Sequence, residues 1–234
     1  MPNKLDYNGV ELTYLSHSGF IIGYGGKRLA IDPFLTYNPY AKASPADIKV
    51  DDVVITHAHF DHIGDAVEIA RSNKCRITAC FGVSDYFSRQ GMETSAIPLG
   101  GTLPADGPKG TGWFTAHFRA AMHNGESPDK ITFAAASSIL LGFGDVKIYH
   151  LGDTALHYDF KLVGEIYKPD IALIPIGGVP TMDIDEAVIA TGWLAPKIAV
   201  PIHYNTFPHI KANPFEFKDK AEKALPVKCV VLEP

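Results

Sequence analysis

The chain has 234 residues, of which 46% are hydrophobic and 20% are charged, so it can bury a substantial core and is not of the disordered class. Its formal net charge of −5 argues against nucleic acid or an anionic membrane as a partner, because both favour a basic surface. The first residues hold no apolar segment typical of signal peptides, and no run approaches the length of a bilayer span, so we expect a cytoplasmic protein.

The first part of the chain is predicted to consist mainly of strands. Apolar-rich segments, with a hairpin signal at Gly25-Gly26, predict strands over residues 10–15, 19–24, 27–32 and 52–56. The last of these is a continuous apolar run, which is typical of a strand covered on both faces. Helices and strands are then expected to alternate, with helices over 64–73 and 83–91 and strands over 75–80 and 94–99.

The second part of the chain repeats this order. A strand is predicted within 110–123, and a hairpin within 131–153 turns at Gly144-Asp145. Helices are then expected over 158–168, 185–195 and 215–225, alternating with strands over 170–177, 197–204 and 227–233. No repeat or linker interrupts the chain, so we expect one domain over residues 1–234. Two halves packed sheet to sheet would give an α/β fold of four layers, αββα, which layer rules permit although element order alone does not single it out.

Three histidines and one aspartate lie within residues 57–62, directly after the apolar run 52–56. His57 and His59 are two positions apart, so in an extended backbone their side chains point the same way. Asp61 and His62 follow in the turn before a helix expected to begin at Gly64. Imidazole and carboxylate groups suit Zn(II), Mn(II), Fe(II) or Ni(II). Further ligands are expected later in the chain, and a catalytic ion must keep one coordination position free. Four such groups in this short segment are therefore too many for one ion, and the pattern predicts two divalent ions.

The segment THAHFDH resembles the His-x-His-x-Asp-His motif of the metallo-β-lactamase fold family, an αββα sandwich with a mono- or dinuclear metal site at the sheet edges. Further candidates follow in the family's order, each after a predicted strand: His123, Asp153 in HLGDT and His203 in PIHYNT. More narrowly, the chain resembles the small metal-dependent hydrolases related to ascorbate-6-phosphate lactonase. The segments that carry this narrower resemblance are His17-Ser18, Asp32-Pro33-Phe34 and residues 177–182.

The resemblance implies two ligand sets and a bridge. His57, His59 and His123 would hold the first ion, Asp61, His62 and His203 would hold the second, and Asp153 would bridge both. His117 lies in the same predicted strand as His123 and competes with it. A metal site at the sheet edge favours His123, because His123 is at the strand end.

Four other residues are weaker candidates. In the family, a carboxylate at the position of Asp32 braces the histidine loop, a task that metal sites commonly need, although an ordinary turn carboxylate is the alternative. His17 is expected to reach the pocket as a substrate-binding or proton-transfer group, with loop packing as the alternative. Thr181 and Met182 are expected to line the mouth of the substrate site. Pro180 stands where the family usually has an aromatic residue. The substrates of the family are therefore a weaker guide to the substrate of this chain.

The chemistry expected of this ligand set is hydrolysis. Two ions that share a bridging water lower its pKa from about 15.7 toward about 7, which supplies a bridging hydroxide at neutral pH. Asp61 would be a ligand and would also orient the nucleophile or accept a proton. We therefore expect a metal-dependent hydrolase whose partner is a small-molecule ester or lactone. A homo-oligomer would be ordinary for an enzyme of this size.

Three other functions fit parts of the pattern. The first is a phosphodiesterase or nuclease of the same fold, acting on a cyclic or short phosphodiester. The second is a diiron enzyme that reduces oxygen or NO, but such relatives usually carry Glu where Ala58 stands. The third is a metal-bound protein that binds a small ligand without turnover.

Overall fold

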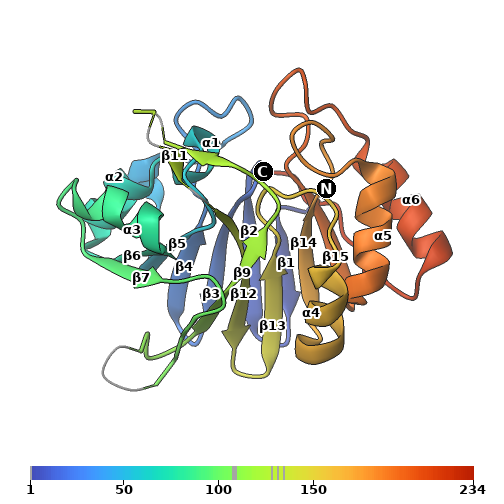
Figure 1. Cartoon of the computed structure of the whole chain (residues 1–234), viewed down its shortest axis with the longest axis horizontal. Coiled ribbons are helices and arrows are strands. Elements are labelled where there is room, and N and C mark those ends of the chain that lie inside the picture. The colour runs from blue at the N-terminus through green and yellow to red at the C-terminus, as the bar shows by residue number, and fades with distance from the viewer. Residues whose placement is uncertain (1, 107–109, 128, 131, 134) are drawn as a thin grey trace.

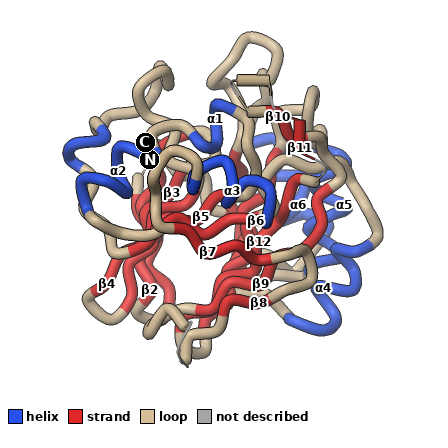
Figure 2. Tube along the Cα trace, turned by 60° about the vertical axis from the view of Figure 1, so that its left-hand side comes forward, coloured by secondary structure: helices blue, strands red, loops and turns tan. Residues whose placement is uncertain are grey.

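The computed structural model describes residues 2–106, 110–127, 129–130, 132–133 and 135–234. Its main features are two seven-stranded sheets that face one another, with helices outside each sheet (Figures 1 and 2). This arrangement confirms the four-layer αββα sandwich expected from the sequence. Among the described residues, no helix is both long enough and apolar enough to cross a membrane.

The first sheet takes its strands in chain order, so neighbours in sequence are neighbours in space. Its strands are β1 (Lys4–Tyr7), β2 (Val10–Ser16), β3 (Gly19–Tyr24), β4 (Lys27–Ile31), β5 (Asp52–Ile55), β6 (Ile77–Cys80) and β7 (Thr94–Ile97). The helices of this half are the 3-10 helix η1 (Pro45–Asp47) and α1 (Phe60–Ile63), α2 (Ala66–Asn73) and α3 (Phe81–Ser88). All four residues of β5 are buried, as its continuous apolar run predicts.

The second sheet has the order β16-β15-β14-β13-β12-β9-β8. Its strands are β8 (Thr102–Leu103), β9 (Thr115–Ala121), β12 (Ala136–Phe143), β13 (Val146–His150), β14 (Ile171–Pro175), β15 (Ile198–Ile202) and β16 (Lys228–Cys229). A separate two-stranded sheet pairs β10 (Gly125–Glu126) with β11 (Thr132–Phe133). The helices of this half are α4 (Asp159–Tyr167), α5 (Ile184–Leu194) and α6 (Pro214–Ala224).

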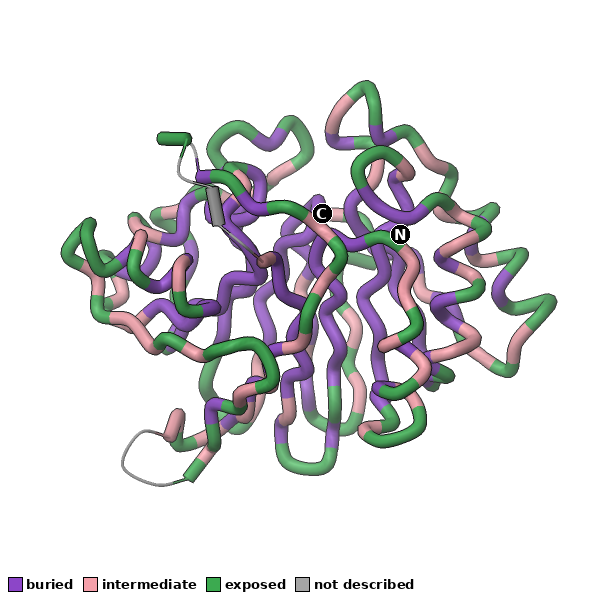
Figure 3. Tube along the Cα trace, in the orientation of Figure 1, coloured by how far each residue is buried: buried purple, intermediate pink, exposed green. Residues whose placement is uncertain are grey.

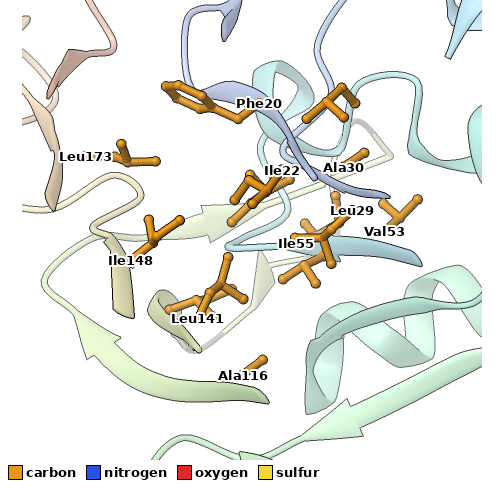
Figure 4. Packing of buried hydrophobic residues seen from close by; sticks show 14 of the residues in the cluster. Phe20, Ile22, Leu29, Ala30, Val53, Ile55, Ala116, Leu141, Ile148 and Leu173 are labelled. Atoms are coloured by element: carbon orange, nitrogen blue, oxygen red, sulfur yellow. The ribbon is translucent and has the colours of Figure 1, made fainter. Parts of the chain in front are cut away.

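The main apolar core lies between the two sheets. Figure 4 shows Phe20 and Ile22 of the first sheet on the same cluster as Leu141 and Ile148 of the second, and all four are fully buried. Each such side chain contributes about 1.5–3 kcal/mol when removed from water. A second cluster joins the outer face of the second sheet to α4, α5 and α6. Figure 3 shows the central strands of this sheet as mostly buried.

The two hairpins predicted from glycine-containing turns are confirmed. Tyr24 pairs with Lys27 across Gly25-Gly26, and both glycines have positive φ, at 58° and 81°. Phe143 pairs with Val146 across Gly144-Asp145, where Gly144 has φ of 57°. These left-handed conformations match the right-handed twist of the paired strands.

Other expectations need correction. The helix expected over 64–73 is α2, which begins at Ala66, and a separate short helix, α1, precedes it and ends at Gly64. The hairpin predicted within 131–153 is shorter than this range: β12 begins at Ala136 and β13 ends at His150, and residues 131 and 134 lie outside the described part of the chain. Strand β1 was not predicted, although Asn8-Gly9 forms the turn that pairs Tyr7 with Val10.

Asp170 precedes β14, and its side chain forms hydrogen bonds with three other segments of the chain. Its carboxylate accepts hydrogen bonds from the Lys147 amide at 2.9 Å and from Lys197 Nζ at 2.8 Å. It also accepts one at 3.4 Å from the hydroxyl of Tyr7, in the other sheet. Burial alone would raise the pKa of Asp170, but Lys197 and the Lys147 amide outweigh burial and hold it below the ordinary 3.8.

Asp170→Asn is expected to lower the free energy of unfolding by about 1 kcal/mol at pH 7, because a charged acceptor becomes neutral. A carboxyl group whose pKa is depressed by folding stabilises the protein fully above its unfolded pKa. The stabilisation disappears as the pH falls through the folded pKa. Urea unfolding of both proteins between pH 7 and pH 3 should therefore show a difference that shrinks toward zero in acid. Asp145→Asn, at an exposed turn, is the matched control; an Asp170 effect independent of pH would contradict this account.

Candidate metal centre

The candidate ligands follow the carboxyl ends of strands that run in the same direction within each sheet. Strands β4 and β5 are parallel, and β2 has the same direction because it is antiparallel to β3, which is antiparallel to β4. In the second sheet, β9, β13 and β15 share one direction in the same way. The carboxyl ends within each sheet therefore meet at one edge, the kind of place where open α/β sheets bind ligands. Helix α1 marks this edge in Figure 1.

The loop after β5 carries four of the candidates. His57 is buried, His59 caps the start of α1, and Asp61 and His62 lie within α1. Gly64 ends this short helix with φ of 34°, and a Cβ atom there would lie 2.5 Å from the carbonyl oxygen of Pro33. The chain therefore turns sharply against the segment after β4, which a larger residue at Gly64 would prevent.

The first group of candidate ligands consists of His57, His59, His123 and Asp153, whose ligand atoms all lie within 4.8 Å of one another. His59 Nδ1 lies 2.9 Å from His57 Nε2 and 3.1 Å from His123 Nε2. Asp153 Oδ2 lies 3.9 Å from His57 Nε2 and 3.6 Å from His123 Nε2. The structure thus brings together residues from both sheets.

The second group consists of His17, Asp61, His62 and His203, under the same 4.8 Å limit. His17 Nε2 lies 3.2 Å from Asp61 Oδ2, and His203 Nε2 lies 4.0 Å from the same oxygen. The ring centroids of His17 and His203 are 4.1 Å apart. Sequence analysis had placed His17 near the pocket as a substrate-binding or proton-transfer group; the structure places it among the candidate ligands.

Asp153 lies between the two groups. Its Oδ1 is 3.1 Å from His62 Nε2, and its Oδ2 is 3.0 Å from His203 Nε2. These short contacts do not have the angles of hydrogen bonds, and among the described residues Asp153 Oδ1, His62 Nε2 and His203 Nε2 are buried without a hydrogen-bond partner. Buried polar atoms that converge without bonding one another need a further partner. A divalent cation fits this donor set of imidazoles and carboxylates.

Burial keeps several imidazoles in the neutral form that binds metals. It lowers the pKa of His57 far below 6.5, lowers that of His59, and lowers that of His123 to about 4. His62 differs, because the carboxylates of Asp153 and Asp32 outweigh its burial and raise its pKa well above 6.5. For Asp153 itself, His203 and His62 outweigh burial and hold its pKa well below 3.8.

Asp32 lies behind the histidine loop and is completely buried. Its carboxylate is 2.7 Å from His62 Nδ1 and accepts hydrogen bonds from the amide and hydroxyl of Thr56, at 2.8 and 2.6 Å. This arrangement orients the His62 ring so that Nε2 points to the ligand cluster. Thr56 also contacts His57 Nδ1 at 3.1 Å, and its carbonyl oxygen accepts hydrogen bonds from the amide and hydroxyl of Ser137 in the opposite sheet.

The competing histidine, His117, lies elsewhere. It is in the middle of β9, where its ring contacts Thr102 and the hydroxyl of Tyr167. His117 belongs to neither group, whereas His123, two residues beyond β9, belongs to the first. Of the two histidines, His123 is therefore the one that lies among the candidate ligands.

The expected substrate-mouth residues differ from one another. Thr181 is nearly buried, and its hydroxyl oxygen has no hydrogen-bond partner. Met182 is fully buried in the apolar cluster beside α4 and α5, so its side chain does not line an open mouth. The exposed apolar residue of this segment is Val179, at 75% exposure. Sequence spacing could not show which side chain faces the core.

Two further residues at the centre were missed by sequence reasoning. Thr56 directly precedes the histidine motif and could have been noted for that reason. Thr206 lies three residues after His203, and its hydroxyl oxygen is 3.0 Å from His17 Nδ1. Its partner is far away in the sequence, so the sequence held no signal for this contact.

Gly177→Ala is expected to displace His203, which is one of the candidate ligands. A Cβ atom at Gly177 would lie 2.3 Å from the carbonyl oxygen of His203, so His203 must move. Overpacking of this kind costs about 1–3 kcal/mol, and a ligand shift of about 1 Å costs about 100-fold in rate. Thermal unfolding and the turnover rate would measure both effects. Gly23→Ala is the control, because a Cβ atom there meets its nearest neighbour at 3.9 Å; equal behaviour of the two variants would contradict the prediction.

Comparisons with known proteins identify the family of this chain. A family model described as "Beta-lactamase superfamily domain" matches residues 11–203. The chain is 37% identical over 230 residues to a UPF0173 metal-dependent hydrolase of Archaeoglobus fulgidus, with 96% of each chain covered. It is 39% identical over 214 residues to a UPF0173 metal-dependent hydrolase of Bacillus cereus, covering 91% of this chain and 93% of the relative.

A solved structure is similar over nearly the whole chain. It is Igni18, described as a novel metallo hydrolase from the hyperthermophilic archaeon Ignicoccus hospitalis, with a TM-score of 0.86 and 39% sequence identity. The match covers 96% of this chain and 95% of Igni18. This chain therefore belongs to the β-lactamase superfamily domain family and, within it, to the metal-dependent hydrolases named UPF0173.

Proposed function

We propose that the chain is a dinuclear hydrolase that acts on a small ester or lactone. The observation that carries the dinuclear proposal is the position of Asp153 between two groups of candidate ligands, with one oxygen 3.1 Å from His62 and the other 3.0 Å from His203. One ion would be held by His57, His59 and His123, and the other by Asp61, His62 and His203, with Asp153 shared. Zn(II), Mn(II), Fe(II) and Ni(II) all suit these ligands.

Divalent ions in such a site lower the pKa of a coordinated water and polarise the substrate oxygen. The protein's own groups hold and orient the site. Asp32 and Thr56 fix the direction of the His62 ring, and Gly64 allows the loop to turn closely against the segment after β4. Asp61, which lies beside His17 and His203, can accept a hydrogen bond from the nucleophile.

The ester or lactone substrate rests on the narrower sequence resemblance to lactonase-related hydrolases. The buried Ala58 also favours hydrolysis over diiron chemistry, because relatives of the diiron type usually carry Glu there. The single domain, the cytoplasmic location and a homo-oligomeric state remain predictions.

A hydrolysis panel tests the proposal. Protein loaded separately with Mn(II), Zn(II) and Ni(II) would be given a sugar-phosphate lactone, an acyl lactone, a thioester and a cyclic phosphodiester. Asp61→Ala is the blank, and His117→Gln is the matched histidine control outside the centre. Lactone or ester turnover that disappears only in Asp61→Ala would support the proposal.

The other outcomes are distinct. Turnover confined to the phosphodiester would replace the ester and lactone proposal with phosphodiester hydrolysis at the same centre. A ligand that raises the unfolding temperature but yields no product would favour a non-catalytic binding protein. Equal turnover by Asp61→Ala and wild type under saturating metal would refute the proposed roles of Asp61.

A further inference from the structure

His17 is held firmly in the turn between β2 and β3. Its side chain is completely buried, and its backbone has φ of 59°, next to Ser16 with φ of 113°. Both values lie in the left-handed region that non-glycine residues rarely adopt. The carbonyl oxygen of His17 accepts hydrogen bonds from the His203 amide at 2.8 Å and from the Tyr14 hydroxyl at 3.1 Å. Strained backbone that is fixed by its surroundings is a common feature of functional sites.

The hydrogen bonds around His17 determine which ring nitrogen carries the hydrogen. Thr206 Oγ1 lies 3.0 Å from His17 Nδ1 and 3.4 Å from the carbonyl oxygen of Tyr204, to which the hydroxyl donates. A hydroxyl has one hydrogen, so a Thr206 hydroxyl that donates to Tyr204 accepts from His17 Nδ1–H. In the neutral ring, Nε2 then has no hydrogen and presents a lone pair.

That lone pair faces a carboxylate. His17 Nε2 lies 3.2 Å from Asp61 Oδ2, and two acceptors at this separation repel unless a cation lies between them. Nearby, both ring nitrogens of His203 are buried without a hydrogen-bond partner. The atoms of His17, Asp61, His62 and His203 are all within 4.8 Å of one another. A shared cation would accept lone pairs from His17 Nε2, from Asp61 and from one ring nitrogen of His203.

We propose that His17 is a direct ligand of the second ion, through Nε2, and that Thr206 fixes the ring in the tautomer that can bind metal. This inference rests on the dinuclear centre proposed above and adds a ligand that comes from the first hairpin of the chain. It assigns His17 a role different from proton donation to substrate, which would need a hydrogen on Nε2.

Two substitutions at His17 separate these roles. His17→Gln offers amide hydrogens to Asp61 but no imidazole nitrogen to a metal. His17→Glu offers a metal-binding oxygen but, when ionised, cannot donate a hydrogen bond to Asp61. If His17 is a ligand, Glu should retain the second ion better than Gln. If His17 serves as a hydrogen-bond or proton donor, Gln should retain function better than Glu.

The readout is metal binding, measured on the purified full chain with Co(II) and Zn(II). We expect two ions per wild-type chain by elemental analysis after dialysis. His17→Gln should weaken binding of the second ion by more than the about 10–100-fold that follows loss of a partner behind a ligand. It should also change the visible absorption bands of the Co(II) protein, which report the ligand field. Thr206→Val, which removes only the tautomer partner, should weaken binding by about 10–100-fold.

Controls make the outcomes separable. His117→Gln should keep both ions and the wild-type spectrum, and circular dichroism of the metal-free proteins would verify folding of each variant. Two ions of unchanged affinity and an unchanged Co(II) spectrum in His17→Gln would overturn the role of His17 while leaving the dinuclear centre in place. A wild-type chain that binds only one ion would instead refute the dinuclear centre, and the His17 proposal with it.

Discussion

His57→Ala and Asp61→Ala are each expected to lower kcat/KM on the substrate found in the panel by at least about 1000-fold. Metal ions stabilise the developing charge of a hydrolytic transition state by several kcal/mol, and about 4 kcal/mol corresponds to this factor. His57 belongs to the first group of candidate ligands and Asp61 to the second, so the two variants remove ligands of different ions. Steady-state kinetics with a saturating metal supply would measure the loss.

The fold should survive both substitutions. Asp61 lies at the surface of the core with 9% of its area exposed, and His57 sits at the loop after β5 and not in the apolar clusters between the layers. Circular dichroism and urea unfolding of the metal-free proteins are the control. If either variant hydrolysed the substrate at the wild-type rate with metal in excess, the dinuclear mechanism would be wrong.

Metal loading is expected to raise the unfolding temperature strongly. A ligand at about 1000 times its dissociation constant stabilises the native state by about 4 kcal/mol. For a chain of this length, each kcal/mol shifts the midpoint by about 2–4 °C, so the rise should be about 8–16 °C. The physical reason is that the cations would bind buried atoms of Asp153, His62 and His203 that have no hydrogen-bond partner among the described residues.

Calorimetry of the metal-free and reloaded protein would measure this rise. His117→Gln should show the full rise, whereas His57→Ala should show a smaller one because it lacks a ligand of the first group. An unchanged midpoint at saturating metal would mean that these buried atoms do not bind a cation in the native state.

Local sequence signals predicted much of the fold and centre. The turns at Gly25-Gly26 and Gly144-Asp145 each need residues that adopt positive φ, so short segments determined two hairpins. The cluster of residues 57–62 identified the loop after β5 because its ligand chemistry is contained in a few neighbouring positions. Position at a strand end also separated His123 from His117.

Non-local features could not be predicted in this way. The contact between His17 and Thr206 joins residues from opposite ends of the chain. The burial of Met182 depends on how the second sheet packs against its helices. The division at Gly64 follows from contact with Pro33, which no helical periodicity reports. Each of these depends on tertiary packing more than on local preference.

The close spacing of His57, His59, Asp61 and His62 also affects the denatured chain. These four residues remain neighbours after unfolding, so the denatured chain keeps a short chelating peptide, whereas His17, His123, Asp153 and His203 disperse. Metal binding to the unfolded state reduces the stabilisation that the same metal gives to the native state. The rise in midpoint with metal concentration should therefore level off once the denatured chain also becomes saturated.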